Sequence, residues 1–232
     1  MSTGRNATLN DVSDTNPPRR SRGRPPLPVD RILAAAVELV DEQGPEALSM
    51  RSLAQRLESG TATLYRHFSN RSQLVSLVID HILGEVDIDA AELAALPWQD
   101  ACTLFAQHMF EALSRHGNAA PLLIEYTPMG PNALANRERC LAVLLDNGFP
   151  PAVAAHAYAT LARYVLGFAI QVSAVTAHGD RRDDELSAEF RRLDPSRFPA
   201  TVTVSDDLPV PLADEFVFGL RLIVAGLERL RM

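Results

Sequence analysis

Residues 48–68 constrain the fold more than any other stretch, because their pattern predicts two short helices joined by a tight turn. Ser49 is of a type that caps helices, and the apolar residues after it recur on one helical face. The first helix is expected to stop at residues 58–60, where Gly60, or Ser59 beside it, lets the backbone turn.

The second helix of this pair has a buried line and an outer face. Thr61 can help to cap it, and Leu64 and Phe68, four residues apart, lie on the same side. At about 100° per residue from that line, Arg66 points directly outward. The outer face is small, polar and basic; beside Arg66 it holds Ala62, Thr63, Tyr65 and His67.

Two helices with a turn of this length are typical of a helix-turn-helix, whose second helix enters the major groove of DNA. An ordinary αα-corner is the alternative that spacing alone leaves open. On the DNA-binding interpretation, Thr63 and Arg66 contact base edges on a face completed by Thr61 and Ala62. The residues then expected to hold phosphates are Ser49, Arg51, Tyr65, His67 and Arg71.

The same stretch carries a resemblance to a known family. The sequence TLYRHF at 63–68, followed by the polar turn SNR and an apolar helix from Leu74, resembles the recognition-helix signature of TetR-type (tetracycline-repressor-like) transcriptional regulators. The resemblance implies operator binding and places Arg71 where these regulators keep a basic phosphate contact. Glu58 and Ser59 depart from the family, which commonly has Gly and then an apolar residue there, so the base-contacting register stays open by one residue.

Length and residue choice favour an all-α fold. The chain has 232 residues, which is about one and a half average domains, and the strand-like alternation at 201–204 is too short to found a sheet. We expect a disordered Arg-containing tail (1–27), an N-terminal three-helix helix-turn-helix DNA-binding domain (28–74) and a larger helical effector-binding and dimerisation domain (75–232).

Charge is distributed unevenly along the chain. The net charge is −7, but residues 1–71 hold ten Arg against eight acids and residues 72–232 hold twelve Arg against twenty-one. A basic head on an acidic body focuses DNA contact at one end. Arg22 and Arg24 in the tail are expected to lie along the minor groove, with a merely solvated tail as the alternative.

Caps and breakers bound the remaining helices. We expect a first helix capped by Asp30 and ended at Gly44, and a fourth capped by Ser69 and running to about Asp87. An Ala-rich linker follows. The body helices are then expected at 97–115, 121–126, from 131 to Asn147-Gly148, 151–177 and 213–230, with a polar excursion at 178–212 holding one short helix at 183–193.

The body also resembles the ligand-binding domain of the tetracycline repressors. The matching motifs are Trp98-Gln99-Asp100, Gly148-Phe149, Leu166-Gly167, Phe218-Gly219-Leu220 and Gly226-Leu227-Glu228. The resemblance implies a homodimer through a four-helix bundle of helices 151–177 and 213–230, and an inducer cavity. A two-fold pair suits DNA half-sites about 34–36 Å apart, whereas both helices serving only as intramolecular core is the alternative.

At the positions that match the metal-binding residues of the tetracycline repressors, this sequence has side chains that do not suit a metal-bound drug as the ligand. Leu123 falls where tetracycline repressors have the His that ligates magnesium, and Gln171 falls where they have a Glu that holds one of the metal's waters, so no metal or cofactor is expected. An uncharged or weakly charged hydrophobic effector is expected instead, with plain core packing as the alternative for each position. The residues expected to line its cavity are Phe105, Met109, Leu123, Tyr126, Cys140, Phe168 and Gln171.

Other functions find little support in the sequence. It has no GxSxG elbow, no HExxH helix and no phosphate-binding Gly loop, so an enzyme is not expected. Cys102 and Cys140 are too few for a disulfide framework. No signal peptide is visible and no apolar run reaches the roughly 18 residues of a membrane span, which indicates a cytoplasmic protein. A dimeric DNA-binding protein without a ligand remains the closer alternative.

Overall fold

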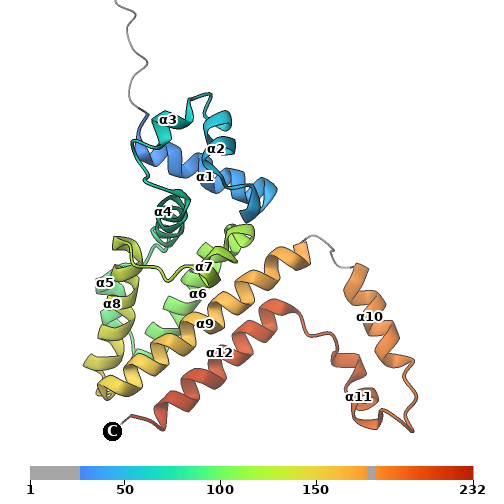
Figure 1. The fold of residues 1–232 in the computed structure, drawn as a ribbon. Coiled ribbons are helices and arrows are strands. Elements are labelled where there is room, and N and C mark those ends of the chain that lie inside the picture. Colours follow the sequence, from blue (N-terminus) through green and yellow to red (C-terminus); the bar gives the residue numbers. More distant parts are fainter. Residues whose placement is uncertain (1–26, 177–180, 232) are drawn as a thin grey trace, which may run out of the picture.

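The computed structural model describes residues 27–176 and 181–231, with side chains described outside 173–182. Every regular element within those residues is a helix, so the expected all-α class is confirmed. The head, drawn blue to green in Figure 1, consists of α1 (Val29–Gln43), η1 (Pro45–Ala47), α2 (Met50–Arg56), α3 (Thr61–Leu64) and α4 (Arg71–Leu83).

The head is held together by a small apolar core and one ion-pair cluster. Leu53, Leu64 and Phe68 are buried against α1 and α4, which confirms the inward line predicted for the helix pair. Arg56 at the end of α2 donates to Glu42 at 2.6 and 2.7 Å and to Glu38 at 3.0 Å, both on α1. These contacts fix the angle of α2 on α1, and with it the position of α3.

Three details of the head differ from the expectation. The turn residue with positive φ is Glu58 (48°), whereas Gly60 is extended (φ −83°) and caps α3 without any side-chain bond from Thr61. Asp30 lies in the first turn of α1 and does not cap it, since the N-cap is Pro28. The cap of α4 is Asn70, whose side chain accepts from Gln73 N at 2.9 Å, and α4 ends at Leu83 rather than near 87.

The body is built around one long central helix. The central helix is α9 (Pro151–Thr176). The other helices of the body are α5 (Ala90–Ala95), α6 (Trp98–Arg115), η2 (Gly117–Ala119), α7 (Leu122–Glu125), α8 (Pro131–Asp146) and α12 (Leu212–Glu228). In Figure 1, α9 and α12 run side by side along one edge, with α6 and α8 on the other side of α9. The rings of Phe110 and Phe216 stack at 4.2 Å between α6 and α12.

The segment Pro151–Val172 of α9 is, by its length and composition alone, able to cross a membrane. The expectation that no segment reaches that length is therefore wrong. The helix packs against α6, α8 and α12 and carries Arg163, and the core helix of a globular domain passes the same test.

Two short segments fold differently from the sequence prediction. The Ala-rich linker contains α5, capped by the side chain of Asp89, which accepts from Ala91 N at 2.9 Å. The polar segment after α9 contains α10 (Arg181–Arg191), which corresponds to the one short helix expected there. It also contains α11 (Pro199–Thr203) and η3 (Ser205–Asp207), which were not expected. Pro199 begins α11 where the alternation at 201–204 had suggested extended chain, because its fixed φ suits a first helical position.

Candidate nucleic-acid interface and effector cavity

The outer face of α3 is available to a partner. Thr61, Ala62 and Arg66 are exposed and Tyr65 is 57% exposed, while Leu64 is buried on the opposite side. After α3 the chain continues in helical turns, since Tyr65 N donates to Thr61 O at 3.0 Å and Phe68 N to Leu64 O at 2.9 Å. These turns extend one helical face through His67.

Within that face the side chains are arranged as a polar cluster. Arg66 Nη2 donates a long hydrogen bond of 3.5 Å to Thr63 Oγ1, so the guanidinium lies beside the hydroxyl. His67 is half-buried, and its ring packs at 6.1 Å from that of Phe68. Arg66 is therefore the exposed basic side chain on this face.

At the start of α2, the two predicted phosphate contacts Ser49 and Arg51 have different surroundings. Ser49 and Ser52 form a reciprocal capping box, with Ser52 N donating to Ser49 Oγ and Ser49 N to Ser52 Oγ, each at 3.1 Å. Arg51, in the first turn of α2, is exposed. Ser49 thus fixes the start of α2, while Arg51 faces solvent beside it.

Arg71 has partners that its sequence position did not suggest. Its Nε donates to Leu48 O at 2.8 Å and its Nη2 to Pro45 O at 3.3 Å. The guanidinium therefore ties the first turn of α4 to the segment just before α2. Arg22 and Arg24, the two tail residues expected in the minor groove, lie outside the described residues.

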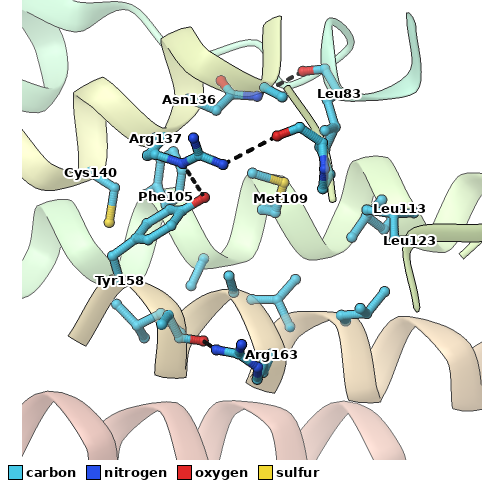
Figure 2. A pocket seen from close by; sticks show the side chains of 18 of the residues that line it. Leu83, Phe105, Met109, Leu113, Leu123, Asn136, Arg137, Cys140, Tyr158 and Arg163 are labelled. Atoms are coloured by element: carbon cyan, nitrogen blue, oxygen red, sulfur yellow. Dashed lines mark hydrogen bonds between the residues drawn. The ribbon is translucent and has the colours of Figure 1, made fainter. Parts of the chain in front are cut away.

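A cavity of about 530 Å³ lies in the body between α6, α7, α8 and α9 (Figure 2). Most of its wall is apolar, which is the usual character of a small-molecule site. The larger apolar side chains in the wall are Leu83, Phe105, Met109, Leu113, Leu123, Ile124, Leu161, Val165 and Leu166, and Cys140 joins them.

The polar part of the wall is concentrated on α8 and α9. Arg137 of α8 faces Tyr158 of α9, with Nε donating to the phenol oxygen at 3.3 Å (Figure 2). Asn136 is buried and donates to Leu83 O at 2.8 Å. Thr127 and Arg163 complete the polar set.

The two cysteines are buried and reduced. Burial raises the pKa of the Cys102 thiol to about 12, and burial, reinforced by Cys102, raises the pKa of the Cys140 thiol to about 12. Both are neutral near pH 7 and act as small apolar side chains. No group of three or more His, Cys, Asp or Glu side chains placed to hold a metal is found in the described part of the chain.

Comparison with known proteins identifies the family. Residues 32–78 match the family described as bacterial regulatory proteins, tetR family, and residues 93–231 match the tetracyclin repressor-like C-terminal domain. An HTH-type transcriptional regulator of Saccharopolyspora erythraea is 33% identical over 215 residues, which cover 91% of this chain and 89% of the relative. The chain belongs to the TetR family.

Two further TetR-family relatives span most of the chain. The HTH-type transcriptional repressor DrrR1 of Streptomyces coeruleorubidus is 31% identical over 224 residues, covering 90% of this chain and 81% of the repressor. The structure of the TetR family protein ActR of Streptomyces coelicolor in complex with actinorhodin has a TM-score of 0.77 and 30% identity, covering 88% of this chain and 98% of ActR.

The positions carried over from the tetracycline repressors are only partly brought together. Phe105, Met109, Leu123 and Cys140 lie in the cavity wall, whereas Tyr126, Phe168 and Gln171 do not. Phe168 is buried between α9 and α12, its ring 5.5 Å from that of Phe216. Gln171 is exposed and its amide donates to Gly167 O of its own helix, one turn earlier, at 3.2 Å. The cavity in this TetR-family chain thus lies along the middle of α9 and does not extend to Phe168 and Gln171.

Sequence reasoning missed the polar part of the wall. Arg137 precedes Cys140 by three residues on α8 and so shares its face, a signal that was present in the helical spacing. On α9, Tyr158, Leu161 and Val165 follow the same rule and mark one face of that helix. The missed polar wall residues are Thr127, Asn136, Arg137, Tyr158 and Arg163.

The cavity wall is joined to the DNA-binding head through α4. Asp80 of α4 is buried, and its carboxylate accepts from Ala133 N at 2.9 Å, thereby capping the start of α8. Gly130 packs so tightly on Asp80 that a Cβ there would overlap the carboxylate. Together with the bond from Asn136 to Leu83, these contacts make α8 and the second half of α4 one hydrogen-bonded unit.

Proposed function

We propose that this chain is a ligand-responsive transcriptional repressor that binds a palindromic operator as a homodimer in the cytoplasm. A small, mainly hydrophobic effector in the cavity releases it from DNA. The observation that carries the proposal is the 530 Å³ cavity, whose wall is hydrogen-bonded to α4, the helix that follows the helix-turn-helix. The relatives named as transcriptional regulators support a regulator rather than an enzyme.

Operator reading is assigned to the outer face of α3. Arg66 and Thr63 contact base edges, and a guanidinium there suits a guanine in the major groove. Arg51, Tyr65 and His67 contact phosphates on either side. Ser49 and Arg71 support them by fixing the start of α2 against α4, as their hydrogen bonds indicate. The tail carrying Arg22 and Arg24 adds minor-groove contacts.

The homodimer is assigned to α9 and α12. Val217, Phe218 and Leu222 of α12 are 39, 58 and 59% exposed, so an isolated chain leaves large apolar side chains in water on this helix. Burying them against the same helix of a second copy gives an isologous interface. Two heads in a fixed arrangement then fit two half-sites about 34–36 Å apart, or a multiple of that distance.

Release follows if the effector changes the position of α8. Because Asp80 and Asn136 bond α8 to α4, a displaced α8 moves α4, and the two heads no longer match the half-sites. The effector needs a different affinity for the two arrangements to shift their populations. A structure of ActR with actinorhodin bound supports a small-molecule effector for a relative of this chain.

The alternative is a DNA-binding protein whose body only dimerises. A body with that role alone needs no apolar recess of this size, partly open to solvent, between its packed helices. The cavity therefore favours ligand control over this alternative.

Two linked measurements test the proposal. Selection from a pool of randomised DNA duplexes should enrich a palindrome. Polycyclic natural products and drugs that raise the melting temperature should then release the fluorescently labelled palindrome. Enrichment without release by any stabilising compound would favour the ligand-independent alternative, and no enrichment would exclude the repressor.

A further inference from the structure

Arg137 is a cation in the cavity wall whose hydrogen-bond partners are all neutral. It is half-buried on α8, and its Nε donates to the Tyr158 phenol at 3.3 Å. Its Nη2 donates to Pro128 O at 3.2 Å, and its Nη1 lies 3.7 Å from Met129 Sδ. The two bonds to oxygen, at 3.2 and 3.3 Å, are longer than the about 2.7–2.9 Å typical of charge-assisted hydrogen bonds to oxygen.

The charge of Arg137 is also not neutralised by a neighbouring acid. The ion pairs formed within residues 27–176 and 181–231 involve Arg56, Arg115, His116, Arg191 and Arg231, but not Arg137. Among the described residues that line the cavity, two are Arg and none is Asp or Glu. The wall therefore has a net positive charge, although the whole chain is acidic.

A half-buried guanidinium beside a mainly apolar space favours an anionic guest. Taking a cation partly out of water is costly unless a negative group pairs with it, and the attraction between two charges grows as the surroundings become less polar. The Tyr158 ring lies 5.7 Å from the guanidinium carbon, which holds the planar fork at the wall. A carboxylate matches that fork with two parallel bonds.

We infer that Arg137 binds an ionised acidic group, a carboxylate or an acidic phenolate, at one end of an otherwise apolar polycyclic effector. This inference rests on the proposed function and names the ligand class that the cavity takes. The acidic group replaces the weak contacts to Pro128 O and Met129, and the rings contact Phe105, Met109 and Leu123. Arg163 is exposed and donates to Ala159 O at 3.2 Å, so water screens its charge more strongly.

The test compares two ligands of the same shape on the full chain. Anthraquinone-2-carboxylate and anthraquinone-2-carboxamide share three rings, and only the first is ionised at neutral pH. Isothermal titration calorimetry on the wild type should give the carboxylate a dissociation constant lower by about tenfold or more, as a charge-assisted bidentate pair implies. This comparison requires no variant.

Substitutions then locate the effect. Arg137→Gln should weaken carboxylate binding to the level of the carboxamide, and Arg137→Lys, which keeps the cation but loses the planar fork, should retain part of the preference. Arg31→Gln removes the same charge from an exposed position on α1 and should change neither affinity. Circular dichroism and melting temperature confirm that each variant is folded.

Several results would overturn the inference. Equal wild-type affinities, or an unchanged preference in Arg137→Gln, would show that no anion is bound by Arg137. Loss of the preference in Arg163→Gln alone would move the anion site to α9. If neutral polycycles bind and the carboxylate does not, this inference fails and the effector cavity stands; if no polycycle binds at all, the proposed ligand control fails as well.

Discussion

The side-chain Nδ2 of Asn136 donates a hydrogen bond of 2.8 Å to the main-chain carbonyl oxygen of Leu83. This bond joins a buried residue of the cavity wall to the last residue of α4. On its other side, the Oδ1 of Asn136 accepts from Arg139 Nη1 at 3.0 Å. The amide is thus held at both ends, and a ligand that displaces α8 must either move α4 or break this bond.

Replacing Asn136 should uncouple the ligand from DNA. Asn136→Leu keeps the number and branching of the side-chain heavy atoms but leaves Leu83 O without its partner, which costs about 1–3 kcal/mol of folding free energy. The factor by which ligand weakens operator binding, about 5- to 150-fold in typical regulators, should fall toward one. Operator affinity with and without ligand, measured by fluorescence anisotropy, gives this factor.

Cys140→Ala is the matched control for the coupling. It also alters a wall residue of α8, but one with no hydrogen bond to α4 among the described contacts. It should change ligand affinity while the coupling factor stays near the wild-type value. An Asn136→Leu protein that still binds ligand and releases operator as the wild type does would exclude the Asn136 bond as the coupling route.

Arg66 and Arg71 should differ in what their loss affects. Arg66 is exposed on α3, so Arg66→Ala should leave the melting temperature unchanged, relax the base preference at one operator position and cost about 1–3 kcal/mol of specific binding. Arg71→Ala loses two hydrogen bonds to main-chain carbonyls, so it should lower the melting temperature and weaken binding to all DNA sequences alike. Thermal melts and titrations with operator and random duplexes separate the two roles.

Salt dependence refines the Arg71 assignment. A direct phosphate contact adds about one unit to the slope of log affinity against log salt, whereas a positioning role does not. An Arg71→Ala protein with unchanged melting temperature and a slope reduced by about one would restore the phosphate role inferred from the sequence. Equal losses on operator and random DNA for Arg66→Ala would contradict its base contact.

The tail should contribute affinity without contributing stability. Deleting residues 1–24 removes five Arg, counted in the sequence, from a segment with almost nothing to bury. DNA affinity should fall and the salt slope should flatten, because fewer counterions are released on binding. The free energy of unfolding in urea should not change. Unchanged DNA affinity would indicate that the tail is only a solvated extension.

A charge on the exposed face of α12 should separate the proposed dimer. Leu222→Glu places a carboxylate at a position that is 59% exposed in the single chain and is expected to be buried between two copies. Light scattering after size-exclusion chromatography should report the monomer mass, and operator binding should be lost. Leu134→Glu, on α8 and 42% exposed, should remain dimeric. A dimer that persists in Leu222→Glu would place the interface elsewhere.

The parts of the fold predicted from sequence are those set by local pattern. Leu64 and Phe68 are buried because a four-residue spacing places them on one helical side, and Pro131 and Pro151 begin α8 and α9 as their fixed φ predicts. The positive φ at Glu58 was missed because Gly60, two residues later, is the residue that normally adopts it.

The cavity could be predicted only in part, because its shape depends on how helices pack. Gln171 was assigned by alignment to relatives and Phe168 was added to the same site, whereas here Phe168 packs against Phe216 and Gln171 is exposed outside the wall. Arg137 was overlooked because an Arg on a helix is usually a solvent-facing residue. Its position beside Tyr158 depends on the crossing of α8 and α9, which no single helix encodes.

Thermodynamic linkage tests the central claim, that binding of the ligand weakens binding of the operator to the same protein. Calorimetric titration with the tightest ligand from the thermal screen, without and with saturating operator, gives two ligand dissociation constants. The account predicts that operator raises the ligand constant by the same factor by which ligand raises the operator constant, because binding free energies are reciprocally coupled. Equal ligand dissociation constants with and without operator would contradict ligand control of this protein.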